Sequence, residues 1–326
     1  MIINKVKIII KNIIWTIHRK KASENEYSSK KSELSNHSQG KTIYLIGRPE
    51  KVGLFSYVET TLRYVAYALE KGYVPFVQIK GYPNTYVEDE CVEHQDMWSL
   101  YFEQPYEVLT GNKVVINECD NILTCIEEDM SKVPYRDGVS RLKQASWFWS
   151  GIYKDFFGLN KSSYEYCEQE FKEIFDGNGT NVLGVLVRGT DIVNAHGHHV
   201  QPSVEKIIKK ARKLIQTGKY SKIYIASEEE KNVNLFRDEF GENRILVNKR
   251  VYYDSVVFGN GLTINDVVSE RENGKYLNGL EYLSSVMLLS RCGGLIGGIC
   301  GGSIAAYYIN GGKYKDVHLL DEGVVR

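Results

Sequence analysis

Short apolar segments alternate with amphipathic ones along most of this chain, and that alternation limits the folds open to it. Residues 42–46 form a continuous apolar run typical of a buried strand, and residues 57–71 carry the apolar stripe of a helix that Gly72 is placed to end. Residues 74–79 are apolar again. Strands that follow one another through helices pair in parallel, because a parallel connection needs a long crossover. The sequence therefore predicts an α/β fold with parallel sheets.

A second series of the same kind begins near Asn181. The patterning predicts further strands over residues 114–116, 181–187, 222–226, 244–247, 294–297 and 317–320. It predicts helices over residues 203–216, 229–240, 280–290 and 304–309. Two series favour two Rossmann-like domains, residues 42–175 and residues 176–326, that face each other across a cleft. Ligands of such sheets bind at the carboxyl ends of the strands, and a cleft between domains is the natural place for a site.

The N-terminal segment departs from this pattern. On a helical wheel the isoleucines of residues 1–21 gather on one face, opposite the lysines. This separation is typical of a helix that lies in a membrane surface, and we expect the protein in the cytoplasm at the inner face of the cell membrane. A signal peptide and a terminal helix packed on the protein itself are the alternatives. Residues 22–41 hold almost no apolar side chain, so we expect a flexible linker there.

Charge and cysteine content argue against several functional classes. The formal net charge is zero, from 41 basic and 41 acidic residues, so no overall positive field points to nucleic acid. The six cysteines form no CxxC pair, and none stands beside a histidine at zinc-ligand spacing. No Asp-x-Asp segment follows a predicted strand to hold Mg²⁺ on a diphosphate. We therefore expect neither a nucleic-acid partner, nor a disulfide scaffold, nor a metal.

The most informative segment is the apolar strand of residues 184–187, which runs directly into Arg188, Gly189, Thr190 and Asp191. An arginine at the carboxyl end of such a strand can present its planar guanidinium to a phosphate. Asp191 would then orient Arg188 or contact a sugar. An ordinary Arg188–Asp191 ion pair that closes a loop is the alternative.

Three histidines follow on the same predicted loop, at His196, His198 and His199. Imidazole can act as a general base, as a hydrogen-bond donor to phosphate or as a metal ligand. A metal site is disfavoured because no further cysteine or histidine stands nearby. A surface cluster without a function is the alternative.

Two other strand ends carry polar or glycine-rich segments. Ser227, Glu228 and Glu229 end one predicted strand and open a helix, where acidic residues ordinarily complement the helix dipole and cap its amides. The glycine-rich residues 293–303 would let backbone amides approach an anion at a helix N-terminus, with Ser303 as a cap or a phosphate donor. Neither segment fits the dinucleotide or P-loop pattern, which argues against an NAD enzyme.

Together these segments resemble the superfamily of core-fucosylating, nodulation-factor and protein O-fucosyltransferases. The donor motif of that family is a strand ending in His-Val-Arg-Arg-Thr-Asp, and residues 186–191 match it. Arg188 falls on the essential arginine and Asp191 on the acidic residue. Leu186 stands where the family has histidine, and Gly189 where it has a second arginine.

The resemblance extends to most of residues 42–326. Residues 226–229 are similar to a second family motif, Ala-Thr-Asp-Asp, and residues 279–303 to a third, an acidic helix that leads to a strand and a serine-containing phosphate loop. Residues 197–202 and 98–105 resemble uncharacterised bacterial members found in surface-polysaccharide clusters.

The resemblance implies a GT-B arrangement and an inverting, metal-independent glycosyltransferase. The donor would be a GDP-sugar, most simply GDP-fucose, with no other cofactor, and the acceptor a glycan of surface polysaccharide or glycoconjugate synthesis. Arg188 and Asp191 would be catalytic, and His196 and His198 are rival candidates for the general base. The donor-binding residues would be Arg188, Ser227, Glu228, Glu281, Gly301, Gly302 and Ser303. The alternatives are the same fold with another nucleotide sugar, a catalytically silent nucleotide- or glycan-binding homologue, and an NAD enzyme.

Overall fold

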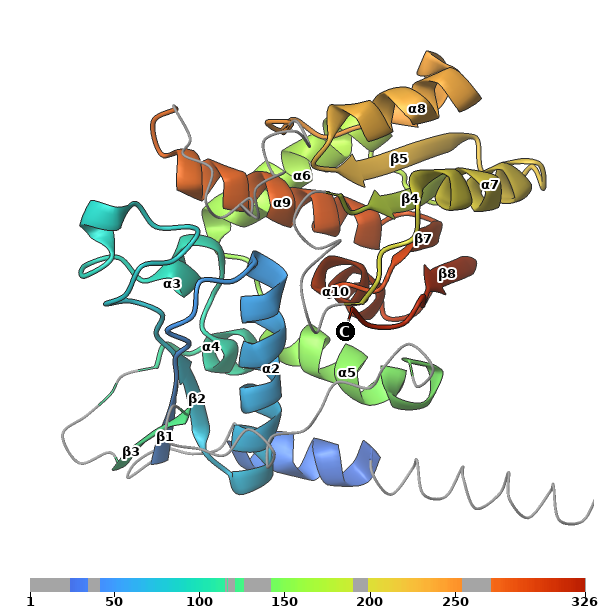
Figure 1. Cartoon of the computed structure of the whole chain (residues 1–326). Helices are drawn as coiled ribbons and strands as arrows, with labels where there is room; N and C mark the ends of the chain where they lie inside the picture. Colours follow the sequence, from blue (N-terminus) through green and yellow to red (C-terminus); the bar gives the residue numbers. More distant parts are fainter. Residues whose placement is uncertain are drawn as a thin grey trace, which may run out of the picture.

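The computed structural model describes residues 24–34, 42–114, 116, 121–125, 142–189, 199–253 and 271–325. Two separate parallel sheets organise these residues (Figure 1). The chain therefore has the α/β fold with parallel sheets that its patterning predicts. The domain boundaries stay a prediction.

The first sheet has three parallel strands in the order β2-β1-β3. They are β1 (Thr42–Ile46), β2 (Val74–Val77) and β3 (Asn121–Thr124). The helices and turns of this half are α2 (Leu54–Lys71), η1 (Asp89–Cys91), α3 (Met97–Tyr101), α4 (Pro105–Thr110) and α5 (Leu142–Phe156). α2 packs beside β1 and β2 and ends at Gly72, which adopts a left-handed conformation (Figure 1).

The strand predicted at residues 114–116 is wrong, because the third strand lies at Asn121–Thr124. The backbone N–H of Val114 donates to Glu107 Oε1 at 3.1 Å. Glu107 belongs to α4, so the side chain of a preceding helix, rather than a neighbouring strand, satisfies this part of the backbone.

The second sheet has five parallel strands in the order β6-β5-β4-β7-β8. They are β4 (Val182–Val187), β5 (Lys222–Ser227), β6 (Ile245–Leu246), β7 (Gly294–Gly298) and β8 (Asp316–Leu320). Their helices are α7 (Val204–Ile215), α8 (Glu230–Phe240), η6 (Glu242–Arg244), α9 (Gly274–Ser290) and α10 (Gly301–Ile309). The strand that comes first in the chain is central, and the direction of winding reverses between β4 and β7. Such a switch point is where open α/β sheets bind ligands.

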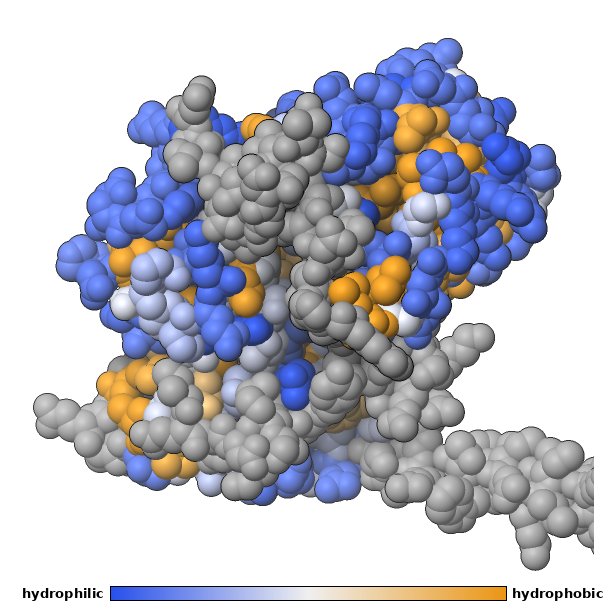
Figure 2. All heavy atoms as spheres, viewed as in Figure 1, coloured by the Kyte–Doolittle hydropathy of each residue, from blue (hydrophilic) through white to orange (hydrophobic). Residues whose placement is uncertain are grey.

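Burial follows from this arrangement. β4 is buried at every position, as expected for a central parallel strand covered on both faces. α7 and α8 lie at the surface of the second half. In Figure 2 this part of the surface is mainly hydrophilic, with some hydrophobic residues among the hydrophilic ones. One hydrophobic core lies between the second sheet and the helices α7 and α8. A larger one runs from the first sheet through α9 and α10. The two halves of the chain therefore share buried apolar surface.

The helix α6 (Lys161–Phe175) packs with the second half, although the sequence analysis assigned it to the first domain. Its Phe175 ring meets that of Tyr224 on β5 at a centroid distance of 5.4 Å. Its Glu170 carboxylate accepts from the backbone N–H of Lys249 at 2.9 Å and from the hydroxyl of Ser284 on α9. α6 therefore packs against the second sheet and α9.

A helix over residues 24–34 replaces the middle of the predicted flexible linker. Tyr27 and Lys31 lie one turn apart, and both bind the carboxylate of Asp155 on α5 at 2.9 Å. Leu34 is buried on the same face. The linker prediction considered composition alone, whereas the contacts with α5 stabilise this helix. Residues 1–21, predicted to lie in a membrane surface, are outside the described residues. In the part that the structure covers, no helix has the length and apolar character needed to span a membrane.

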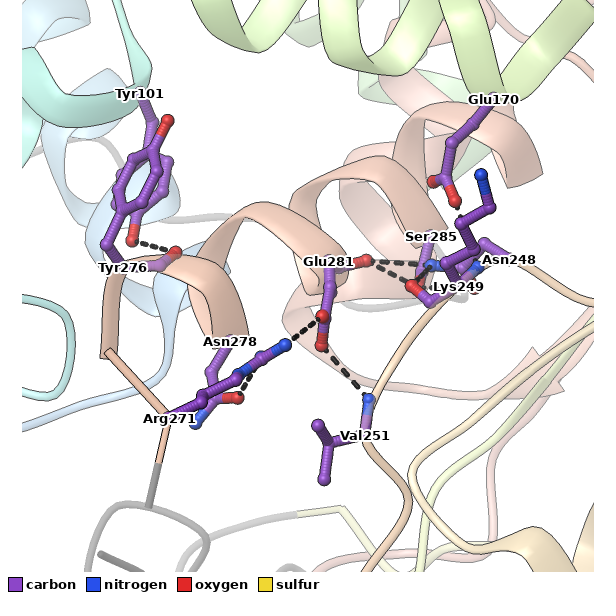
Figure 3. Close-up of polar contacts among 10 residues, drawn as sticks. All are labelled: Tyr101, Glu170, Asn248, Lys249, Val251, Arg271, Tyr276, Asn278, Glu281 and Ser285. Atoms are coloured by element: carbon purple, nitrogen blue, oxygen red, sulfur yellow. Dashed lines mark hydrogen bonds and ion pairs between the residues drawn. The ribbon is translucent and has the colours of Figure 1, made fainter. Parts of the chain in front are cut away.

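The first half of the chain also contacts the start of α9. Tyr101 at the end of α3 stacks on Tyr276 with ring centroids 5.4 Å apart, and its hydroxyl donates to the Tyr276 carbonyl at 2.8 Å (Figure 3). A Cβ atom on Gly279 would lie 2.2 Å from that hydroxyl, so only glycine allows this approach. α9 is therefore fixed to both halves.

Candidate functional site

The carboxyl ends of β4, β5 and β7 meet at the switch point of the second sheet. Arg188 follows β4, Glu228 follows β5, and the turn into α10 follows β7. The register pairs Val187 with Ser227 and Leu186 with Gly297, so these three segments leave the sheet side by side. The strand ends predicted to carry the chemistry are therefore neighbours.

Arg188 forms an ion pair with Glu228. Its Nη1 donates to Glu228 Oε1, and the two side chains are 9% and 4% exposed. The other carboxylate oxygen, Glu228 Oε2, has no hydrogen-bond partner among the described residues. A charge pair this far from solvent is retained only with close contact, because removing each ion from water is costly. Arg188 thus contacts an acid from the neighbouring strand, while its predicted partner Asp191 lies outside the described residues.

An aromatic ring lies beside the guanidinium. Arg188 Cζ is 5.5 Å from the centroid of Tyr282 on α9. The ring of Phe55, in the first turn of α2, meets the Tyr282 ring edge-on at 5.4 Å. Burial raises the pKa of Tyr282 well above its ordinary value, so the phenol is neutral at physiological pH. The guanidinium therefore adjoins a neutral aromatic ring.

Gly189 makes room for a second acid. A Cβ atom there would lie 2.5 Å from the carboxyl carbon of Glu229. Asn232 Nδ2 donates to Glu229 Oε2 at 3.0 Å, and Lys231 Nζ lies 3.1 Å from the same oxygen. The absence of a side chain at position 189 therefore lets a buried carboxylate pack against the backbone beside Arg188.

The acids after β5 make no side-chain capping bond, although Glu230 lies in the first turn of α8, where it complements the helix dipole. α8 begins at Glu230, and its N-cap residue Glu229 makes no side-chain capping bond. Ser227 is buried, and its Oγ accepts from Glu229 N and from Asn232 Nδ2, both at 3.2 Å. Ser227 therefore orders the entry into α8, while Glu228 faces Arg188.

Two helix N-termini meet at this site. Gly301 starts α10, and a Cβ atom on it would lie 3.3 Å from the backbone of Phe55 in the first turn of α2. Neither helix has an acidic residue in its first turn. The amide ends of helices carry partial positive charge, so their meeting beside Tyr282, the ring that adjoins Arg188, favours an anion.

Ser303 is turned away from solvent. Its hydroxyl donates to the Gly298 carbonyl at 2.8 Å and accepts from the Cys300 amide at 3.1 Å, and the residue is fully buried. Ser303 therefore closes the glycine turn and caps α10, which was one of its two predicted roles. Contact of Gly301, Gly302 and Ser303 with a donor stays a prediction.

Glu281 lies in a separate polar cluster along α9 (Figure 3). Its carboxylate is held by Arg271 Nη1 at 2.6 Å and by the backbone N–H of Val251 at 3.1 Å. Its carbonyl accepts from Asn248 Nδ2 at 3.1 Å and from the Ser285 hydroxyl at 2.8 Å. Glu281 thus fixes the segment after β6 onto α9. Its role in donor binding stays a prediction.

The predicted catalytic residues Asp191, His196 and His198 lie outside the described residues. His199, at the edge of that segment, has its Nδ1 3.5 Å from Asp321 Oδ1. Within the described ranges, the acidic, cysteine and histidine side chains form no cluster that could hold a metal ion.

Sequence reasoning missed Tyr282, Phe55 and Glu229 at this site. Tyr282 immediately follows Glu281 in a helix recognised for its apolar character, so its aromatic ring carried no distinctive signal. Phe55 precedes the apolar stripe from which its helix was predicted. The sequence did hold a signal for Glu229. Gly189 stands where the family motif has arginine, and the missing side chain leaves space for a neighbouring one.

Comparison with known proteins finds similarity in three-dimensional structure. No protein-family model and no curated protein matches the chain. Fucosyltransferase NodZ from Bradyrhizobium is 11% identical, with 82% of this chain and 93% of that chain covered and a TM-score of 0.44. POFUT1 in complex with GDP-fucose is 8% identical, with 88% and 99% covered and a TM-score of 0.49. A mutant of Arabidopsis thaliana FUT1 in complex with GDP is 9% identical, with 91% and 76% covered and a TM-score of 0.47.

Proposed function

We propose that this chain is a glycosyltransferase that takes a sugar from a nucleoside diphosphate, most simply fucose from GDP-fucose, and transfers it to a glycan. One observation carries the proposal. Arg188 stands at the switch point of a parallel sheet, beside Tyr282, whose ring adjoins the first turns of α2 and α10. A guanidinium together with helix amides is the combination that binds phosphate oxygens.

Arg188 and the amides of α10 stabilise the leaving diphosphate in this proposal. The acceptor hydroxyl attacks the anomeric carbon from the face opposite the phosphate, so the configuration inverts. The bond between that carbon and the β-phosphate oxygen breaks, and the negative charge that develops on the oxygen is met by Arg188. The resemblance supplies His196 or His198 to take the hydroxyl proton and Asp191 to orient the reacting groups.

Glu228 must share Arg188 with the incoming phosphate. The pair is nearly buried and formally neutral, so a diphosphate that binds Arg188 competes with the carboxylate for the guanidinium. Glu228 therefore adjusts donor affinity, and it holds Arg188 at the sheet edge in the absence of the donor.

The proposed setting is a GT-B enzyme whose two Rossmann-like domains face each other across a cleft. It works without a divalent metal at the cytoplasmic side of the membrane, in the synthesis of surface polysaccharide or a glycoconjugate. The motif resemblance supports the fold and the mechanism. The segregation of isoleucine and lysine in residues 1–21 supports the membrane contact.

Thermal denaturation with nucleotides tests the donor. We expect GDP to raise the melting temperature more than UDP, ADP or NAD, because a ligand that binds only the folded protein stabilises it by mass action. A rise with UDP or ADP alone would change the donor, and a rise with NAD alone would contradict the transferase. No rise with any of them would contradict nucleotide binding.

Transfer itself needs a second assay, because GDP binding alone is also expected of a silent homologue. The Arg188–Glu228 pair and the glycine at position 189 are the observations that favour this alternative. Labelled GDP-fucose is therefore offered with a panel of glycans. Formation of a fucosylated product supports the glycosyltransferase. If the chain binds GDP but neither transfers fucose nor hydrolyses GDP-fucose, the result supports the silent homologue.

A further inference from the structure

Tyr282 lies in the candidate site, although no motif assigns it a function. Its ring centroid is 5.5 Å from Arg188 Cζ. This lies within the range of about 6 Å over which a guanidinium and an aromatic ring attract each other. Tyr282 keeps part of its surface exposed, whereas Glu281 and Leu283 on either side of it are buried. Tyr282 is therefore placed both to touch the arginine and to meet a ligand.

The orientation of the ring is set by the first turns of two helices. The Phe55 ring, on α2, stands at 90° to the Tyr282 ring. Gly302, on α10, has no side chain, and a Cβ atom there would come within 2.7 Å of the Tyr282 hydroxyl. Tyr282 is thus held between the two helix N-termini that meet beside Arg188.

The ring and Glu228 act on different parts of the arginine. Glu228 binds the tip of the guanidinium at Nη1. A phosphate that binds Arg188 competes for those N–H groups, but it leaves the attraction to the ring intact. The ring can therefore support Arg188 while the guanidinium exchanges one anion for another.

We propose that Tyr282 is a positioning residue that holds the Arg188 guanidinium in place for the donor's β-phosphate. This inference rests on the proposed function and deepens it. It assigns the effect to the aromatic ring rather than to the hydroxyl. It also makes the affinity for the β-phosphate depend on α2, through Phe55.

Calorimetric binding of GDP and GMP to Tyr282 variants tests the inference. Tyr282→Leu removes the ring, and we expect it to weaken GDP binding by about tenfold, the effect of losing a partly desolvated cation–π contact. GMP lacks the β-phosphate, so its affinity should change by less than about twofold. Tyr282→Phe keeps the ring and should bind GDP within about twofold of the wild type.

Two controls separate positioning from general damage. In an Arg188→Gln background, Tyr282→Leu should weaken GDP binding no further, because the group it supports is gone. Tyr276→Leu removes another partly exposed tyrosine of α9 that stacks on Tyr101 instead. It should leave GDP affinity per folded protein unchanged, with the folded fraction taken from the melting curve of each variant.

Each result decides the matter. Equal GDP affinity of Tyr282→Leu and the wild type would overturn the inference, and so would equal weakening by Tyr282→Phe and Tyr282→Leu. Parallel losses for GDP and GMP would also overturn it, because the effect would then not pass through the β-phosphate. If the wild type binds no GDP, the proposed function fails first.

Discussion

Arg188 carries two tasks that the structure joins in one side chain. Its pairing with Glu228 neutralises a buried carboxylate, and its place at the end of β4 suits a phosphate. Removing one partner of a buried pair leaves the other charge unpaired and costs about 3–5 kcal/mol. Truncation of Arg188 therefore lowers stability as well as activity, and a substitution that keeps the charge is the cleaner test.

At the residue scale we predict that Arg188→Lys lowers turnover on the order of a hundredfold while the protein stays folded. Lysine keeps the positive charge beside Glu228 but cannot offer two parallel N–H groups to a phosphate. Turnover per folded molecule and the melting temperature are measured on the same preparation. Turnover within a fewfold of the wild type would contradict a requirement for the paired N–H groups of Arg188.

At the scale of elements, α6 joins the second half through a buried carboxylate. Burial raises the pKa of Glu170, and hydrogen bonds from Ser284 and from the backbone of Lys249 oppose this shift. A raised pKa means that the folded state favours the protonated form. The stability this contributes is complete below pH 4.5, the ordinary value, and is lost as pH rises through the folded pKa.

We predict that Glu170→Gln raises the melting temperature at neutral pH. The amide keeps an acceptor for the Lys249 N–H and carries no charge to bury. The gain should shrink as pH falls from the raised folded-state pKa of Glu170 towards 4.5, because the wild-type carboxyl then becomes protonated as well. Melting curves from pH 4 to pH 8 measure this, and Glu165→Gln, at an exposed position of α6, is the matched control. A gain independent of pH would contradict the assignment.

The same scale shows what local pattern can and cannot predict. The strand ahead of Arg188 was predicted because six consecutive buried positions leave an unmistakable apolar run. The helix over residues 24–34 was missed because Asp155, a distant residue, binds its Tyr27 and Lys31. Arg188 was found from its place at a strand end. The contact between Phe55 and Tyr282 was not, because it depends on how α2 and α9 pack together.

At the scale of the whole molecule, the mechanism proposed for the leaving diphosphate needs no divalent metal. We predict full transfer activity in excess EDTA, because Arg188 and the amides of α10 supply the positive charge. The assay compares initial rates with EDTA alone and with added Mg²⁺ or Mn²⁺. A loss in EDTA that either ion restores would refute the metal-independent mechanism.

Membrane association is also a property of the whole chain. We predict that deletion of residues 1–21 releases the protein from vesicles that contain anionic lipid, because the lysines and isoleucines of this segment suit a membrane surface. Co-sedimentation at low and high salt measures binding. A truncation that leaves the helix over residues 24–34 in place keeps its contact with α5. If the truncated and full-length chains bind the vesicles equally, the membrane contact lies outside residues 1–21.

The space above Gly189 also restricts how this site can change by mutation. The carboxyl carbon of Glu229 lies 2.5 Å from where a Cβ atom at position 189 would stand. An arginine at position 189, which the related motif carries, would therefore require the Glu229 carboxylate to move. Gly189→Arg is therefore expected to displace the Glu229 carboxylate from Asn232 and Lys231. We expect the effect of a side chain at position 189 to depend on which residue stands at position 229.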